Sequence, residues 1–210
     1  MAEKTEITRK SERELVITRT FDAPRELVWK AWTDPARIPH WWGPRRYETI
    51  VDVMDVRPGG RWRFRNRDAE GHEFAFHGEY REVVPPERIV QTFEFEGMPG
   101  HVSIDTATLE DIGGGRTKVT ARSLFASVED LQAMVASGME EGARETYDRL
   151  GELLQMMKAG SRTANPSTGG ALVLSRTFDA TTEQLWAAWT DPAIYAKWFN
   201  PAGIDLVIHE

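Results

Sequence analysis

The 210-residue sequence contains no cysteine. This absence excludes a disulfide framework, a thiol nucleophile and any zinc site that uses cysteine. An excess of positive charge is also absent. The formal net charge is −7, which argues against a general nucleic-acid binder, because such proteins present a basic face. No apolar run resembles a signal peptide or approaches the roughly 20 residues of a membrane span. We therefore expect a cytoplasmic protein without a nucleic-acid or membrane partner.

The familiar catalytic patterns are missing as well. No two of the five histidines have a helical ligand spacing, and no serine lies in a nucleophile elbow. The run Gly113-Gly114-Gly115 lacks the lysine and the following helix of a phosphate-binding loop. We accordingly predict no metal, no cofactor and no catalytic residue. The sequence favours a protein that is not an enzyme. A weaker alternative is a cyclase or hydrolase, in which Tyr80 would be the only obvious acid.

The sequence does contain a duplicated segment. Residues 19–44 read RTFDAPRELVWKAWTDPARIPHWWGP, and residues 176–201 read RTFDATTEQLWAAWTDPAIYAKWFNP. Roughly every second position is identical, which indicates an internal repeat. We expect one complete domain at 14–158 and a partial second copy at 171–210, containing the first strand and helices only. A linker at 159–170 and a disordered N-terminus at 1–13 complete the predicted organisation.

Alternating apolar and polar residues after Tyr47 predict a meander of antiparallel strands with one apolar face. The same alternation predicts the register of the strands. It places Arg63 opposite Ala75, Phe76 opposite Phe93 and Phe95 opposite Val102. On the last two strands the predicted inner residues are Val102, Ile104, Thr106, Val119 and Ala121.

A capping box at Ser127–Asp130 predicts the start of a helical region that continues to about Lys158. Gly138 and Gly142 each lower the helix propensity by about 1 kcal/mol. Gly138 therefore indicates either a break in this helix or a close approach of its backbone to the sheet. The predicted inward-facing side chains include those of Leu150, Leu154 and Met157.

Several separated motifs carry a family resemblance. They are the TFDAP and AWTDP segments of the repeat, DVRPGGRWRFR at 55–65, PPERI at 85–89 and GMEEGARETYDRLGELL at 138–154. In this order they resemble the Hsp90-ATPase-activator-homologue branch of the START-like (SRPBCC) superfamily, over residues 14–158 and again over 171–210. The resemblance implies an α+β helix-grip fold, in which a curved antiparallel sheet wraps around a long C-terminal helix. Fold alone does not determine function.

The predicted inner face of the sheet combines aromatic residues with a few polar ones. Buried polar groups are costly unless they form hydrogen bonds, whereas a few polar groups among aromatic side chains are typical of small-molecule sites. We predict a cavity between the sheet and the C-terminal helix that binds a small hydrophobic or amphipathic ligand. Alternatively, the polar residues bond one another within a solid core. The predicted lining residues are Trp62, Phe64, Phe76, Tyr80, Gln91, Phe93, Thr106 and Met139.

Other partners follow from the family and from the repeat. The family name implies a second hypothesis, a co-chaperone-like domain with a chaperone partner and a role in the stress response. The aromatic residues of the partial copy predict a homodimer formed through residues 171–210. Finally, the arginines at 57, 61, 63, 65 and 67 form either a phosphate-binding stripe or, as we expect, a solvated sheet face balanced by acidic residues on neighbouring strands.

Overall fold

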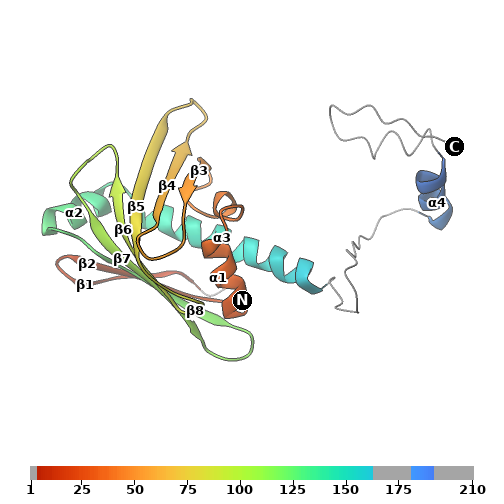
Figure 1. Ribbon diagram of the computed structural model, residues 1–210, viewed down its shortest axis with the longest axis horizontal. Coiled ribbons are helices and arrows are strands. Elements are labelled where there is room, and N and C mark those ends of the chain that lie inside the picture. The colour runs from red at the N-terminus through yellow and green to blue at the C-terminus, as the bar shows by residue number, and fades with distance from the viewer. Residues whose placement is uncertain (1–3, 163–180, 192–210) are drawn as a thin grey trace. The chain divides into compact units, whose positions relative to one another are not determined.

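The computed structural model describes residues 4–162 and 181–191. The chain divides into two compact units, at 1–162 and 163–210. The first unit is an α+β domain. A curved antiparallel sheet packs against one long helix near its C-terminal end (Figure 1). This architecture confirms the predicted helix-grip fold. None of the described helices is long and apolar enough to cross a membrane.

Eight strands form a single sheet in the order β1-β2-β8-β7-β6-β5-β4-β3. Every neighbouring pair is antiparallel. The strands are β1 (Glu6–Ser11), β2 (Glu14–Phe21), β3 (Glu48–Met54), β4 (Arg61–Arg67), β5 (Glu73–Val84), β6 (Arg88–Phe95), β7 (Ser103–Asp111) and β8 (Thr117–Leu124).

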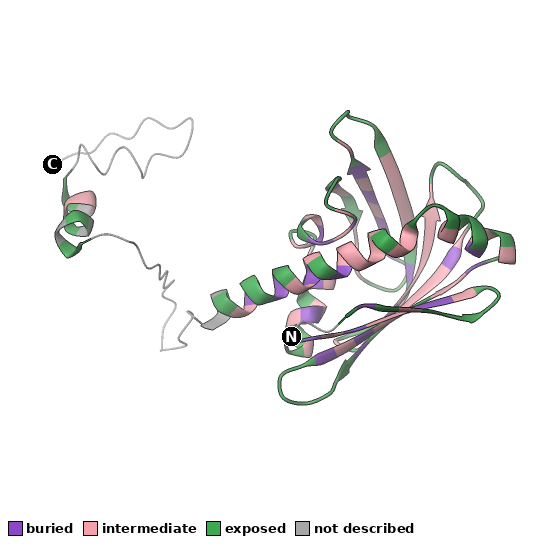
Figure 2. Cartoon of the chain, turned by 180° about the vertical axis from the view of Figure 1, so that it is seen from behind, coloured by how far each residue is buried: buried purple, intermediate pink, exposed green. Residues whose placement is uncertain are grey.

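The helices of this unit lie on one side of the sheet (Figure 2). They are α1 (Arg25–Thr33), the 3-10 turn η1 (Ile38–His40), α2 (Val128–Ala136) and α3 (Met139–Arg162). Tyr147, Leu150, Leu154 and Met157 are buried, and their spacing places them on one face of α3. This face joins Trp62 and other sheet residues in one hydrophobic cluster, as predicted for Leu150, Leu154 and Met157.

The N-terminal segment corrects one prediction. Residues 1–13 were expected to be disordered, but Glu6–Ser11 forms β1 and pairs with β2. Its charged and polar sequence gives little hydrophobic periodicity, which is why the strand was missed. Charged side chains are common on edge strands because they discourage pairing with another molecule. Ile7 packs against the second hydrophobic cluster, which contains Leu15 and Phe125.

Two predicted registers are displaced by two residues. Arg63 pairs with His77 rather than Ala75, and Phe76 pairs with Phe95 rather than Phe93. A shift of two residues keeps every side chain on its predicted face, because side chains alternate with a period of two.

The predicted register of β7 is wrong by one residue. Phe93 pairs with Ser103, whereas the prediction placed Phe95 opposite Val102. The buried residues of β7 are Ser103, Ala107 and Leu109. The predicted inner residues Val102, Ile104 and Thr106 therefore alternate onto the opposite face.

A break at Gly138 separates α2 from α3, which resolves the alternative left open by the sequence. Gly138 has φ +81°, a left-handed backbone conformation that costs other residues energy. The Gly138 amide donates to the carbonyl of Val135 and so closes α2. Helix α3 continues to Arg162, so the first four residues of the predicted linker at 159–170 are helical.

In the second unit, the structure describes helix α4 (Thr182–Thr190) and its two flanking residues. The bounds of α4 match those of α1 in the sequence repeat. The hydroxyls of Thr33 and Thr190 each donate to the carbonyl four residues earlier, at 2.8 Å in both helices. The remaining parts of the predicted linker and of the partial copy at 171–210 lie outside the described residues.

Candidate functional site

A cavity of about 400 Å³ lies between the inner face of the sheet and the helices α2 and α3. Strands β2, β6, β7 and β8 contribute one wall, and the Trp41–Arg46 loop contributes another. The break at Gly138 borders the cavity, as does Gly142. A Cβ atom at Gly142 would lie 3.2 Å from Cγ of Pro44, so the small residue allows α3 to approach this loop closely.

The structure brings together five of the eight predicted lining residues. They are Phe76, Gln91, Phe93, Thr106 and Met139. The other three, Trp62, Phe64 and Tyr80, do not line the cavity but are buried in the hydrophobic core beside it. Thr106 contributes to the wall even though strand alternation turns its side chain toward the other face of β7.

Aromatic rings form much of the apolar wall. The ring of Trp42 meets the ring of Phe76 edge to face, with centroids 5.3 Å apart. Phe76 in turn packs on Phe93 at 5.5 Å. Trp32 and Trp41 form a further pair at 5.2 Å, and the indole of Trp41 donates to the carbonyl of Ala31. These contacts hold the rings in place and give the cavity a defined aromatic surface.

Asp105 is the charged group of the sheet-side wall. Its carboxylate accepts a hydrogen bond from the Ser103 hydroxyl at 3.1 Å and another from Ser123 on β8. Burial raises the pKa of Asp105 to about 6, and the two hydroxyls only partly offset this effect. The side chain is half-buried, and because Asp105 lines the cavity, part of its accessible surface faces the cavity.

The sequence-based prediction missed Asp105 because it reversed the faces of β7. One signal in the sequence indicates the correct register. Leu109 lies between Thr108 and Glu110, so it is the apolar residue that this end of the strand buries. Strand alternation from Leu109 then places Ala107, Asp105 and Ser103 on the inner face. The β-branched residues Val102, Ile104 and Thr106 suggested the opposite assignment.

Two buried tyrosines differ in their relation to the cavity. Tyr147 on α3 lines it, and burial together with the charge of Asp105 raises the pKa of its hydroxyl. Burial, with a smaller effect from Asp55, likewise raises the pKa of Tyr80. Because Tyr80 lies in the core, it does not occupy the acid position that the weaker cyclase or hydrolase hypothesis would require.

Helix α2 and the start of α3 form one end of the cavity through Met134, Ser137 and Met139. The predicted capping box at the start of α2 is present, with Ser127 and Asp130 exchanging hydrogen bonds. His101, from the β6–β7 hairpin, lies 2.5 Å from Asp130. Hydrogen bonds from His101 and Ser127 lower the pKa of Asp130. These contacts fix the position of α2 against the sheet.

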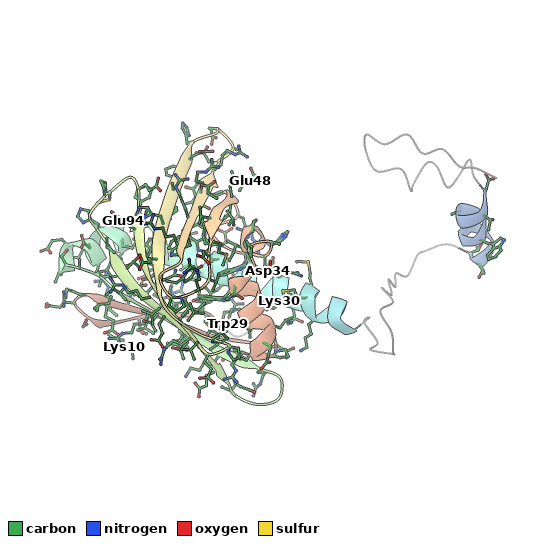
Figure 3. All side chains as sticks on the ribbon, viewed as in Figure 1. Lys10, Trp29, Lys30, Asp34, Glu48 and Glu94 are labelled. Carbon is green, nitrogen blue, oxygen red and sulfur yellow. The ribbon has the colours of Figure 1, made fainter. Side chains whose placement is uncertain are left out.

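Three arginines of β4, at 63, 65 and 67, form ion pairs with acidic residues on the other face of the sheet, as expected. Arg65 pairs with Glu73 at 2.7 Å, and Arg63 pairs with Glu96 at 2.7 Å. Arg67 pairs with Glu48. Glu48 lies at the start of edge strand β3 (Figure 3). Asp52 also contacts Arg63 and Arg65. These carboxylates occupy the positions that a phosphate would need, so the solvated-face interpretation holds.

One group of side chains among the described residues has a spacing suitable for a metal. The ligand atoms of Asp68, Glu70 and His72 lie within 4.8 Å of one another on the β4–β5 turn. However, Asp68 already accepts hydrogen bonds from the backbone amides of Glu70 and His72. These bonds stabilise the turn itself, and none of the three residues lines the cavity.

Comparison with known proteins identifies the family. The model of the "Activator of Hsp90 ATPase homolog 1-like protein" family matches residues 22–155. The chain belongs to this family. This match confirms the resemblance found in the sequence, and membership supports a ligand-binding or co-chaperone-like domain in general. No curated protein matches the chain.

Solved structures of three proteins at 26–28% identity share the fold. A protein from Rhodobacter sphaeroides is 27% identical, with a TM-score of 0.67 over 74% of this chain and 99% of that chain. A protein from Arthrobacter aurescens is 26% identical, with a TM-score of 0.67 over 72% and 91%. A protein from Mycobacterium smegmatis is 28% identical, with a TM-score of 0.63 over 71% and 97%.

Proposed function

We propose that the domain binds a small amphipathic ligand in the cavity between the sheet and α2–α3. The observation that carries this proposal is the pairing of an aromatic wall with polar groups in one cavity. Phe76 and Phe93 supply apolar surface, while Asp105 and Gln91 supply polar atoms. Small-molecule sites typically combine a mostly apolar lining with a few polar groups that orient the ligand.

The strongly perturbed pKa of Asp105 supports the same proposal. Ionisable groups with shifted pKa values cluster at functional sites, because burial that is costly for folding is retained where it serves binding or chemistry. A hydrophobic core built for stability alone would use an apolar side chain at this position of β7. Catalysis is no part of the proposal, and no cofactor or metal is required.

The family description favours a second candidate, a co-chaperone-like domain that acts on Hsp90. The two functions differ in which surface they use. Ligand binding depends on cavity residues such as Ala121, whereas stimulation of a chaperone ATPase would depend on the exterior of the domain. The co-chaperone function would be supported instead if the purified protein stimulated Hsp90 ATPase activity. Variants whose cavity is filled by larger side chains should then stimulate it to the same extent.

The homodimer remains a proposal for residues 171–210. Its support from the described part of the second unit is the exposure of Trp186 on α4, which is 71%. A large exposed apolar side chain is typical of interaction surfaces when it belongs to a wider patch. A second copy of the chain, which carries the same segment, is the partner we propose.

The cavity proposal is tested by filling the cavity. Ala121 and Ala143 line it, so Ala121→Leu and Ala143→Leu should prevent the binding of the uncharged fluorescent probe Nile red without lowering the melting temperature. Ala75→Leu is the matched control. Ala75 lies between Phe74 and Phe76 in the sequence of β5, so its side chain points to the opposite face of the strand, away from the cavity. Probe binding that survives both cavity-filling changes, or that falls equally in the control, would contradict the proposal.

A further inference from the structure

We infer that the ligand of the cavity is an amphipathic amine, with its protonated nitrogen against Asp105 and its apolar body against the aromatic wall. This inference rests on the proposed function and narrows it to one chemical class. Three features of the described residues carry it: a half-buried carboxylate without a counter-ion, the neutral groups that face it, and the aromatic surface beside it.

The first feature is that Asp105 has no counter-ion. Among residues 4–162 and 181–191, ion pairs join many surface carboxylates to arginine, lysine or histidine, but none of these pairs includes Asp105. Its hydrogen-bond partners are the neutral hydroxyls of Ser103 and Ser123. An ionised carboxylate removed from water without a cationic partner is costly. A bound cation would offset this cost.

The second feature is the set of groups that face Asp105. Its cross-strand neighbours are Gln91 on β6 and Ser123 on β8, and α3 contributes Tyr147, whose pKa the charge of Asp105 raises. None of these groups is cationic. An ammonium group carries three donors, and the Asp105 carboxylate and the side-chain oxygen of Gln91 are acceptors on this wall.

Arg46 is the single basic residue among those that line the cavity. Its side chain is exposed, and its guanidinium group lies over the ring of Tyr47 at 4.9 Å from the centroid. Among the ion pairs of the described residues, none joins Arg46 to Asp105. It therefore does not neutralise Asp105. Because that pKa is about 6, the carboxylate is largely ionised at neutral pH and attracts a cation.

The third feature is the aromatic surface. Trp42, Phe76 and Phe93 present packed rings to the same cavity. Such faces attract cations and bury apolar groups, so one wall suits both parts of an amphipathic amine. An anionic ligand would face repulsion from Asp105. A neutral alcohol could donate one hydrogen bond to the carboxylate but would leave its charge uncompensated.

The test uses three probes that share one ring system and differ in charge: 1-naphthylmethylamine, 1-naphthalenemethanol and 1-naphthoic acid. Calorimetric titration of the full-length protein at about pH 8 should show the amine binding at least tenfold more tightly than the alcohol, a difference of about 1.4 kcal/mol. The Asp105→Asn variant should bind the alcohol with similar affinity and lose the preference for the amine. The control variant Glu110→Gln, which removes an exposed carboxylate of the same strand, should keep the preference for the amine.

The unmodified protein provides a second measurement that does not depend on how a variant folds. The amine preference should fall about tenfold at about pH 5, because Asp105 is then mostly protonated while the amine keeps its charge. Equal affinity for amine and alcohol in the unmodified protein would overturn the amine inference and leave the cavity proposal intact. So would a preference that survives in Asp105→Asn. Failure of all three probes to bind would overturn the cavity proposal itself.

Discussion

His101 and Asp130 connect the β6–β7 hairpin to the first turn of α2, with Nδ1 of His101 2.5 Å from Oδ1 of Asp130. The hydrogen bond from His101 is the main reason that the pKa of Asp130 is lowered. Because the pKa of Asp130 is lowered in the folded state, the contact stabilises the fold at pH values above the ordinary carboxyl pKa near 4. This contribution is lost as the pH falls below that value and through the folded-state pKa.

His101→Ala should therefore raise the pKa of Asp130 toward its ordinary value, which an NMR titration of the carboxyl group would measure. Because α2 closes one end of the cavity, amide exchange within 128–136 should also become faster. His72→Ala is the matched control, since it removes the histidine of a similar contact with Asp68 elsewhere in the fold. An unchanged Asp130 titration in His101→Ala would show that the two side chains do not interact in solution.

Asp105→Asn should stabilise the domain at neutral pH. Because the pKa of Asp105 is raised in the folded state, ionisation of its carboxyl group destabilises the fold. The domain therefore has its full stability at pH values below the ordinary carboxyl pKa near 4 and loses part of it as the pH rises through about 6. Replacing the ionised carboxylate should therefore increase the free energy of unfolding near pH 7 by roughly 1–3 kcal/mol. Urea unfolding at several pH values would measure this gain, which should shrink as the pH approaches 4.

Glu110→Gln is the control for this change as well, because Glu110 is exposed on the same strand and should give no comparable gain. A variant that is less stable than the original at neutral pH would contradict the prediction. It would show that the hydrogen bonds from Ser103 and Ser123 stabilise the ionised carboxylate by more than its burial costs.

Gly138→Ala should destabilise the domain by about 1–2 kcal/mol, because the left-handed backbone between α2 and α3 is strained for a residue with a Cβ atom. Gly138→Asn should cost less, since asparagine adopts this conformation more readily. Thermal or urea unfolding of the two variants would measure the difference. A steric clash does not explain the loss of stability, because a Cβ atom at this position would meet nothing within 4 Å. An alanine variant as stable as the original would argue against a left-handed break at this residue.

Removal of residues 163–210 should convert a dimer to a monomer and leave the melting temperature of the first unit unchanged. The first unit contains its own hydrophobic core, whereas α4 exposes Trp186. Sedimentation of the full-length and truncated chains would measure their masses. Trp186→Gln in the full-length chain should weaken the same association. The same oligomeric state for the full-length and truncated proteins would contradict the dimer proposal.

Most of the fold could be predicted because it depends on repeated local patterns. Alternation placed Trp62 and Phe64 on the inner face, and helical spacing placed Leu150 and Leu154 on the buried side of α3. Registers within hairpins were less certain, because a shift of two residues leaves the pattern unchanged. Pattern also failed for β1, which gains its hydrogen bonds as a charged edge strand.

The site was predicted only in part, for a related reason. Phe76, Gln91 and Phe93 were identified because strands β5 and β6 were assigned to the correct face. Asp105 was missed because β-branched residues on both sides of it suggested the opposite face of β7. Whether an inner-face residue lines the cavity or lies in solid core, as Tyr80 does, depends on the position of the helices, which alternation does not specify.

The alternation along β7 and β8 also makes the domain a promising scaffold for protein engineering. Ladder hydrogen bonds between these strands are made by the backbone, while Ser103, Asp105 and Ser123 project side chains from it. The polar lining can thus be exchanged one position at a time without removing a backbone hydrogen bond of the β7–β8 ladder. A library at these three positions would sample new ligand preferences on a constant framework, and the tryptophans beside the cavity would provide a built-in optical signal of binding.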